Sequence, residues 1–225
     1  MLTIKLFATL KDKAGRVVLR LDGGYATVAD LLKHMSGLFP ALSDAVNQKS
    51  ILISVNQEFV KPDHRLKDGD EVALMPPFSG GDRIRDGGVR IQTGPFDIND
   101  EIERIKRSSS SIGGIVTFLG TTRDISQGKN VSRLEFEHYP GMAEQKLAEI
   151  REQAINDYGV IDVTIIHRVG TLPVGENIVL IVVAARHRDE AFKACRFCID
   201  ELKRITPIWK KETTPEGEVW VEEHP

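Results

Sequence analysis

A ten-residue segment limits the fold of this chain more than any other feature. Residues 79–88 read Ser-Gly-Gly-Asp-Arg-Ile-Arg-Asp-Gly-Gly, with four glycines, alternating charges and one large apolar side chain. A segment of this composition has almost nothing to bury and is typical of a connector. The chain has 225 residues, which is enough for two domains that each bury a core. We therefore expect domains over residues 1–81 and 89–225, joined by a linker over residues 82–88.

The first domain has a pattern of two strands, one helix and two further strands. Apolar spacing predicts a hairpin of residues 2–6 with residues 17–21, followed by strands over residues 51–55 and 71–75. Thr27, with an acidic residue three positions later, predicts the start of the helix. A helix with one apolar stripe covers only one face of a small sheet. This order indicates the β-grasp, or ubiquitin-like, fold.

The second domain is predicted to be of the α+β class. Its most apolar run, residues 178–185, lacks the alternation of a half-exposed strand and is expected at the centre of a sheet. Asp189 is expected to cap the last helix. Helices are predicted over residues 98–106, 143–158 and 189–205, strands over residues 89–92, 114–119, 133–137 and 163–168, and a hairpin of residues 208–211 with 219–222.

Composition excludes several classes of function. A net charge of −3 argues against binding nucleic acid, and no apolar run approaches the ~20 residues that span a bilayer. The amino terminus lacks the pattern of a secretory signal, so we expect a cytoplasmic protein. Cys195 and Cys198 fall at helical spacing among apolar residues, and no second pair completes a zinc site. We interpret both as core residues and expect no metal site.

Glycine pairs are weak signals on their own in this chain. Composition alone predicts roughly 1.6 pairs, and four occur. Only Gly80-Gly81 comes a few residues after the last strand of the predicted ubiquitin-like domain. Two residues without side chains make a thin thread that can enter a narrow pocket and present a terminal carbonyl. The alternative is that this pair is simply part of the linker.

Motifs in both halves resemble the molybdopterin synthase family. The stretch Leu66-Lys-Asp-Gly-Asp-Glu-Val-Ala-Leu-Met-Pro-Pro-Phe-Ser before Gly80-Gly81 is similar to the end of the small, sulfur-carrying subunit. Residues 89–222 are similar to the large, catalytic subunit. The stretches that carry this second resemblance are Val116-Thr-Phe-Leu-Gly-Thr-Thr-Arg123, Glu137-His-Tyr-Pro-Gly-Met142, Ile166-His-Arg-Val-Gly170, Arg186-His-Arg188, Leu202-Lys203 and Pro207-Ile-Trp-Lys-Lys-Glu-Thr-Thr-Pro-Glu-Gly217.

The resemblance implies a fold, a reaction and a set of site residues. It implies an α/β-hammerhead-like second domain that transfers two sulfurs to cyclic pyranopterin monophosphate and so forms the molybdopterin dithiolene. Lys203 and Lys210 match the catalytic lysines, and a partly desolvated lysine can act as acid, base or nucleophile. We expect Lys203 to be essential and Lys210 to orient the substrate or the sulfur donor. The matching substrate-binding residues are Thr121, Thr122, Arg123, His187, Arg188, Lys211 and Glu212. Phe118 is expected in the core.

The resemblance also implies partners and one conflict. In this family the carrier ends in a glycine carboxylate, which an adenylating, sulfur-loading enzyme converts to a thiocarboxylate. Here Gly81 is joined to Asp82, so no free carboxylate exists until a protease cleaves after Gly81. The catalytic domain is expected to form a homodimer and to need no cofactor. The carrier tail could dock in the pocket of its own chain or in that of a neighbour.

Two alternatives remain open from the sequence. A lysine near a helix end or in a hairpin is more often a solvated charge than a catalytic group. The second domain could therefore be a different phosphate-handling enzyme, which would turn over substrate without a sulfur donor. It could also be a non-enzymatic anion-binding domain fused to a ubiquitin-like modifier, which would not bind a pterin.

Overall fold

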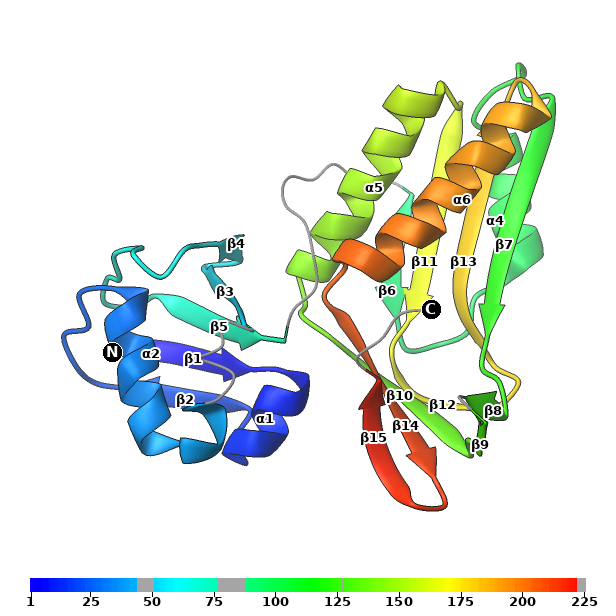
Figure 1. Cartoon of the computed structure of the whole chain (residues 1–225). Coiled ribbons are helices and arrows are strands. Elements are labelled where there is room, and N and C mark those ends of the chain that lie inside the picture. The colour runs from blue at the N-terminus through cyan, green and yellow to red at the C-terminus, as the bar shows by residue number, and fades with distance from the viewer. Residues whose placement is uncertain (44–50, 77–87, 127, 222–225) are drawn as a thin grey trace. The chain divides into compact units, whose positions relative to one another are not determined.

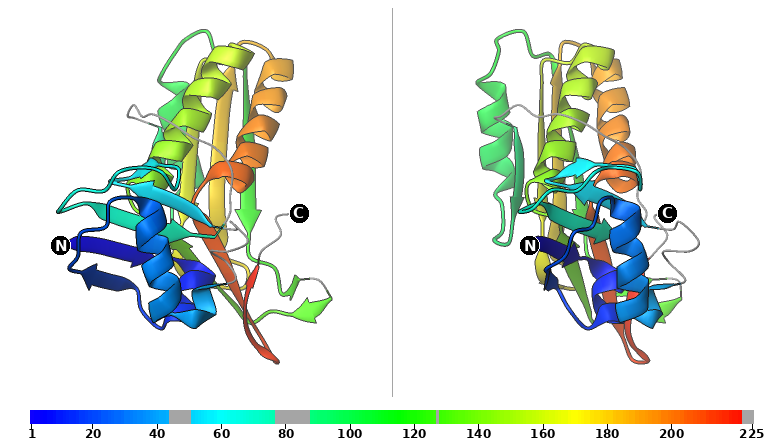
Figure 2. Two further views of the ribbon diagram at one scale, coloured as in Figure 1. Left: turned by 60° about the vertical axis from the view of Figure 1, so that its left-hand side comes forward. Right: turned by 90° about the vertical axis from the view of Figure 1, so that its left-hand side faces the viewer.

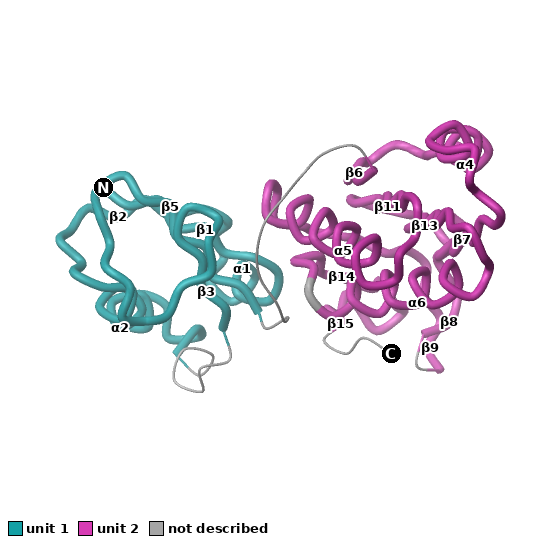
Figure 3. The backbone as a smooth tube through the Cα atoms, turned by 90° about the horizontal axis from the view of Figure 1, so that it is seen from above, with its two compact units in different colours: residues 1–78 teal, residues 79–225 magenta. Residues whose placement is uncertain are grey.

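The computed structural model describes residues 1–43, 51–76, 88–126 and 128–221. The chain divides into two compact units, Met1–Phe78 and Ser79–Pro225 (Figure 3). Gly80, Gly81 and residues 82–87 lie outside the described residues, so the predicted linker and carrier tail stay predictions. Within the described ranges no helix combines the length and the apolar character needed to cross a membrane.

The first unit is a five-stranded sheet in the order β2-β1-β5-β3-β4. Its central strands, β1 (Leu2–Leu6) and β5 (Glu71–Met75), run parallel. β2 (Val18–Leu21) joins β1 antiparallel, while β3 (Leu52–Val55) and β4 (Glu58–Phe59) continue the sheet beyond β5. This arrangement confirms the predicted β-grasp fold.

The helix of the first unit is α2 (Val28–Leu38), which begins where the sequence predicted. The Thr27 hydroxyl accepts from the Asp30 backbone N–H at 3.3 Å, and the Asp30 carboxylate accepts from the Thr27 backbone N–H at 3.0 Å. This reciprocal pair satisfies two N–H groups that the first helical turn leaves free. The apolar stripe of the helix is buried in the core and consists of Val28, Leu31, Leu32 and Met35.

The connection between β1 and β2 differs from the prediction. A short helix, α1 (Ala8–Ala14), separates the two strands, so they are not joined as a hairpin although they pair antiparallel. Gly15 ends α1 in the left-handed conformation, with φ of 62°. Seven residues are too few for helical periodicity to be visible in the sequence. A 3-10 turn, Pro40–Leu42, after α2 was missed for the same reason.

The main sheet of the second unit has the order β6-β11-β13-β7. Its strands are β6 (Val89–Gln92), β11 (Asp162–Arg168), β13 (Asn177–Ala185) and β7 (Gly114–Thr121). β13 pairs antiparallel with both β11 and β7, and its last seven residues are all buried. The prediction that the most apolar strand is central is confirmed.

Three helices cover the two faces of the main sheet (Figures 1 and 2). α5 (Met142–Tyr158) and α6 (Arg188–Ile205) lie side by side on one face, and α4 (Ile98–Lys106) lies on the other. The N-cap of α6 is His187, so the expectation that Asp189 caps this helix is wrong by two positions.

The two cysteines lie on the buried face of α6. Cys195 and Cys198 are 5% and 0% exposed and belong to the core between α5, α6 and the main sheet. Burial raises the pKa of Cys195 to about 11 and raises the pKa of Cys198 as well. Thiols of this kind are inert packing residues, as the sequence predicted.

A second sheet, in the order β12-β10-β14-β15, completes the second unit. β14 (Ile208–Thr214) and β15 (Gly217–Val221) form the predicted terminal hairpin, and β10 (Arg133–His138) pairs with β14. The structure adds strands of two to four residues that were not predicted. They are β12 (Gly170–Pro173) at the sheet edge, and β8 (Ile125–Ser126) with β9 (Lys129–Asn130) in a small hairpin.

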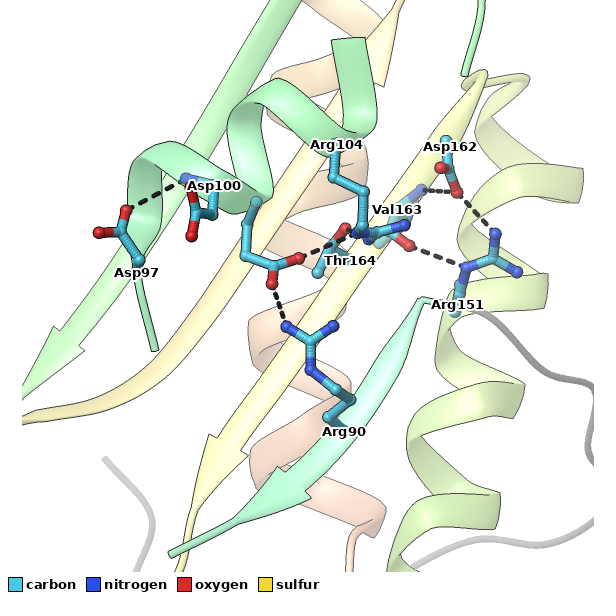
Figure 4. A network of polar contacts seen from close by, with 9 residues as sticks. Arg90, Asp97, Asp100, Arg104, Arg151, Asp162, Val163 and Thr164 are labelled. Carbon is cyan, nitrogen blue, oxygen red and sulfur yellow. Dashed lines mark hydrogen bonds and ion pairs between the residues drawn. The ribbon is translucent and has the colours of Figure 1, made fainter. Parts of the chain in front are cut away.

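A polar network fastens α4 and α5 to the main sheet (Figure 4). The Glu101 carboxylate, 8% exposed, pairs with Arg90 on β6 and, at 3.0 Å, with Arg104 one turn further along α4. Arg104 in turn donates to the Thr164 hydroxyl on β11. On the α5 side, Arg151 donates to the Val163 carbonyl at 2.8 Å and to Asp162 at 2.6 Å. Glu101 is therefore the acceptor on which the α4 part of the network depends.

We expect Glu101→Gln to lower the free energy of unfolding of the second unit by about 1–3 kcal/mol, because two guanidinium groups lose their anionic partner. The matched control is Glu103→Gln on the same helix, whose exposed carboxylate pairs with Lys106 at 2.6 Å. This control should leave the stability of the second unit almost unchanged, because an exposed i,i+3 ion pair contributes little. Urea unfolding followed by tryptophan fluorescence measures both, since Trp209 and Trp220 are the chain's only tryptophans and lie in the second unit. Equal losses would contradict the assignment.

Candidate active site

A cavity of about 360 Å³ lies in the second unit between its two sheets and the C-terminal end of α6. The end of the main sheet forms the floor of the cavity. β10 with β14 forms one wall, and the last turns of α6 form another. The β8–β9 hairpin contributes residues at its rim. The lining residues are Phe118, Gly120, Thr121, Arg123, Ile125, Ser126, Leu134, Phe136, His167, Ile178, Val179, Ile199, Leu202, Lys203, Ile208, Lys210 and Glu212.

Three paired positions of the main sheet form one floor of the cavity. His167 on β11 is opposite Val179 on β13, and Val179 is opposite Gly120 on β7. A Cβ atom at Gly120 would lie 2.6 Å from the Val179 Cγ1 atom and 3.5 Å from the Phe118 ring. Glycine is therefore needed at this position so that Val179 and Phe118 can keep their places in the floor.

Cationic side chains reach the cavity from three different elements. Lys203 comes from the last turn of α6, Lys210 from β14 and Arg123 from the segment after β7. Lys210 Nζ lies 2.9 Å from Glu212 Oε1, two positions along the same strand face. Lys203 and Arg123 have no ion pair with any described residue, so their charges are available to a ligand. The sequence-predicted residues Thr121 and Glu212 also line this cavity.

Thr122 is placed differently from its neighbours. Its side chain is 3% exposed and does not line the cavity. The Thr122 hydroxyl donates to the Pro173 carbonyl at 2.6 Å and accepts from the Glu176 backbone N–H at 2.9 Å. The adjacent backbone is also fixed, because the Thr122 N–H donates to the Glu176 carbonyl at 2.9 Å. Thr122 therefore anchors the segment that carries Arg123.

Lys211 lies on the opposite face of β14 from Lys210, as neighbouring residues in a strand must. Its ammonium is 3.0 Å from both Glu135 and Glu218 and lies over the Trp220 ring at 5.4 Å. Partial burial disfavours the charged form, but hydrogen bonds to the two carboxylates prevail and hold the pKa of Lys211 above its usual value. In this structure Lys211 ties the smaller sheet together outside the cavity.

His187 and Arg188 are not brought to the cavity of their own chain. Both are exposed and lie at the start of α6, whereas Lys203 lies in its last turn. Arg188 and Lys203 are fifteen positions apart along the α-helix, a rise of roughly 22 Å. No single small ligand in this cavity spans that distance.

His167 lines the cavity and was not singled out from the sequence. Its ring is 4% exposed, and Nδ1 lies 2.7 Å from the Arg168 carbonyl oxygen. Burial lowers the pKa of His167 to about 4, with His138 adding to the effect. The imidazole is therefore neutral near pH 7. His167 falls within the stretch Ile166-His-Arg-Val-Gly170 that carries the family resemblance, but nothing in the sequence indicated that its side chain faces a cavity.

The depressed pKa of His167 predicts a stability that falls with acidification. Below pH 6.5 this histidine is protonated in the unfolded chain, whereas in the folded chain it stays neutral down to about pH 4. The folded state therefore loses stability relative to the unfolded state as the pH falls from 6.5 to about 4. Between pH 7 and pH 5 the protonation of this histidine in the unfolded chain should lower the free energy of unfolding by about 2 kcal/mol. Urea unfolding of the wild type and of His167→Gln at both pH values measures the contribution of His167 to this pH dependence. An identical pH dependence in the two proteins would refute it.

The remaining cavity residues are mostly apolar, and the sequence offered no sign that they line a site. Phe118, expected in the core, both packs on the core of α5 and α6 and faces the cavity. Among the described residues no group of three or more His, Cys, Asp and Glu side chains is placed to hold a metal ion. The cavity thus combines an apolar floor with an unpaired lysine and arginine, which suits an anionic ligand with a flat apolar part.

Comparison with known proteins agrees with this division of the chain. A family model described as MoaE protein matches residues 91–205, and one described as ThiS family matches residues 4–81. The molybdopterin synthase catalytic subunit of Ralstonia nicotianae is 46% identical over 134 residues, covering 60% of this chain and 76% of that protein. The protein of the same name from Pyrococcus abyssi is 48% identical over 134 residues, covering 60% and 90%.

A solved structure supports the same assignment for the second unit. The chain is similar to molybdopterin synthase from Staphylococcus aureus with a TM-score of 0.55 and 34% identity, covering 59% of this chain and 96% of that one. The family match covers α6, which carries Lys203, and the strands β7, β11 and β13, which contribute Gly120, His167 and Val179 to the cavity. The chain belongs to the MoaE protein family and carries a ThiS-family domain in the same polypeptide.

Proposed function

We propose that this chain is a molybdopterin synthase with carrier and catalytic domains in one polypeptide. The second unit transfers two sulfurs to cyclic pyranopterin monophosphate and forms the molybdopterin dithiolene. Each sulfur comes from a glycine thiocarboxylate at the end of the carrier, which returns to a carboxylate as oxygen replaces the sulfur. The scheme uses no metal and no organic cofactor, and we expect it to run in the cytoplasm.

The observation that carries this proposal is the placement of Lys203 and Lys210 on different walls of one cavity. Lys203 is half-buried and unpaired among the described residues, whereas Lys210 is held by Glu212 at 2.9 Å. An unpaired lysine can move a proton or attack a carbon, and a paired lysine is better suited to hold a substrate in place. We assign proton transfer or nucleophilic attack to Lys203 and orientation to Lys210.

The substrate is expected to bind with its two ends in different surroundings. Arg123 and the lysines favour the phosphate, because a guanidinium can donate two parallel hydrogen bonds to phosphate oxygens. The apolar floor, with Val179 and Phe118, offers a flat surface for a fused ring system. Thr121 and Glu212 line the same cavity and are proposed to hydrogen-bond the ligand.

His187 and Arg188 require a second copy of the chain if they bind substrate. They lie roughly 22 Å along α6 from Lys203, yet both match substrate-binding positions of the family. We propose that the catalytic unit forms a homodimer in which these two residues act at the cavity of the neighbouring chain. Lys211, which is fixed between two carboxylates, is proposed to support β14 rather than to touch the substrate.

The carrier function requires two further proteins. A protease must cleave after Gly81, and an adenylating, sulfur-loading enzyme must then convert the new carboxylate to a thiocarboxylate. The fused chain is accordingly proposed to be a precursor.

One experiment separates this function from its alternatives. The chain is incubated with cyclic pyranopterin monophosphate, with and without residues 1–81 carrying a terminal thiocarboxylate. We expect sulfur-containing product only with the donor. Turnover without the donor would indicate a different phosphate-handling enzyme. Absence of precursor binding would indicate an anion-binding domain fused to a ubiquitin-like modifier, and either result would refute the proposal.

A further inference from the structure

The proposed scheme gives no role to His167, the histidine of the cavity. His167 lines the cavity at the end of β11, on the sheet face that carries Val179 and Gly120. A carbonyl oxygen can only accept, so the 2.7 Å contact between His167 Nδ1 and the Arg168 carbonyl places the ring proton on Nδ1. The edge-on Phe136 ring, 5.4 Å away, fixes the imidazole plane.

The second ring nitrogen is therefore an acceptor. A neutral imidazole with its proton on Nδ1 has a lone pair on Nε2. No described residue hydrogen-bonds His167 Nε2. The atom is also not fully enclosed by the protein, so a ligand in the cavity can reach it. An acceptor at the wall of a largely apolar cavity gains most from a ligand that supplies the missing donor.

The surroundings of Nε2 restrict the kind of donor. The Lys210 ammonium, on the strand position paired with Phe136, is already engaged by Glu212 at 2.9 Å. Val179 and Phe136 next to the imidazole are apolar. A flat ring with an N–H group fits this part of the cavity, while the anionic end of the same ligand is favoured by Lys203 and Arg123.

We propose that His167 is a substrate-binding and specificity-determining residue whose Nε2 accepts a hydrogen bond from an N–H of the pterin ring system. This inference rests on the proposed function, because it assigns a partner to a group of that substrate. The lone pair on Nε2 accepts a hydrogen bond from a ring nitrogen that bears hydrogen, and it is repelled by a ring nitrogen that bears a lone pair. His167 therefore favours the reduced pterin, whose pyrazine nitrogens carry hydrogen, over the oxidised aromatic form.

Two substitutions separate the roles of the two ring nitrogens. In His167→Asn the amide nitrogen stands near the position of Nδ1 and can still donate to the Arg168 carbonyl, but nothing replaces Nε2. In His167→Gln the amide reaches the position of Nε2. Calorimetric titration with the reduced precursor should give a Kd raised about tenfold for His167→Asn, the loss of one hydrogen bond, and a smaller change for His167→Gln.

The oxidised precursor, titrated into the same proteins, identifies the donor. If His167→Asn weakens the reduced form alone, the donor is a pyrazine N–H, and the preference of the wild type for the reduced form disappears. If both forms weaken equally, the donor is on the pyrimidine edge, which both forms share; the binding role then stands and the preference for reduced pterin is refuted. An unchanged Kd for both forms would overturn the proposal.

A measurement on the wild type does not depend on whether a variant folds. In protein labelled with 15N-histidine, the His167 Nε2 resonance should be that of an unprotonated nitrogen and should move when the reduced precursor is added. A histidine that only packs the core would keep its resonance while the precursor binds, which would overturn the inference. If the wild type does not bind the precursor at all, the proposed function fails and the inference fails with it.

Discussion

Lys203→Ala should reduce the rate of dithiolene formation by roughly 10²- to 10⁴-fold, the contribution typical of a positioned proton-transfer group. Lys203 is the cavity lysine without an ion pair among the described residues, so its ammonium is free to act on the substrate. The substitution removes a half-buried side chain at the end of α6 and leaves the buried Leu202 beside it in place. We therefore expect the fold to be retained, with an unchanged circular dichroism spectrum.

The matched control for this substitution is Lys193→Ala on the same helix. Lys193 is exposed, pairs with Asp189 at 2.6 Å, and does not line the cavity. Its replacement should change the rate by less than about twofold, since an exposed i,i+4 pair contributes little. Both rates are measured with excess thiocarboxylated carrier, so that sulfur loading is not limiting. Substantial turnover by Lys203→Ala would remove this lysine from the mechanism.

Asp82→Pro should abolish sulfur transfer by the fused chain while leaving Gly80 and Gly81 in place. Proline after the scissile bond fixes its own φ and restricts the preceding residue, which makes the Gly81 peptide bond a poor protease substrate. Without cleavage Gly81 has no carboxylate to load. Gel analysis should show only the full-length chain, and the product should fall to background.

Two additions make this result specific to the cleavage site. Asp86→Pro, the same substitution four positions further along, should be cleaved and active as the wild type is. Residues 1–81 with a free terminal carboxylate, added in trans with the loading enzyme, should restore product formation by Asp82→Pro, because its catalytic unit is intact. An uncleaved Asp82→Pro chain that forms product without this addition would show that cleavage is unnecessary.

Long apolar patterns account for the parts of the fold that the sequence predicted. The stripe from Val28 to Met35 repeats at helical spacing, and β13 is a continuous apolar run whose last seven residues are buried. Elements too short for a repeat escaped detection, namely α1 with seven residues and β8 and β9 with two each. α1 packs against β5, far along the chain, and ends at Gly15, whereas β8 and β9 pair with each other through two residues each, so neither shows a repeat in the sequence.

The candidate site was predictable only in part, for geometric reasons. Alternation along a strand separates Lys210 from Lys211, and this could have been foreseen from the sequence once β14 was predicted. Helix length separates Arg188 from Lys203 in the same way. The cavity floor could not be foreseen, since Val179 and Gly120 become neighbours only through the pairing of β13 with β7. The role proposed for His167 depends on the contact of its Nδ1 with the Arg168 carbonyl, which the sequence does not reveal.

The most direct test of a fused synthase is a mass measurement on a working reaction. The full chain, purified from cells that produce it naturally, is incubated with the sulfur-loading enzyme and cyclic pyranopterin monophosphate, and both product and protein are analysed. We predict a dithiolene product together with a fragment ending at Gly81, part of it heavier by the exchange of one oxygen for sulfur. Product formed while every chain remains full-length, or loaded carrier without any sulfur in the precursor, would contradict the account.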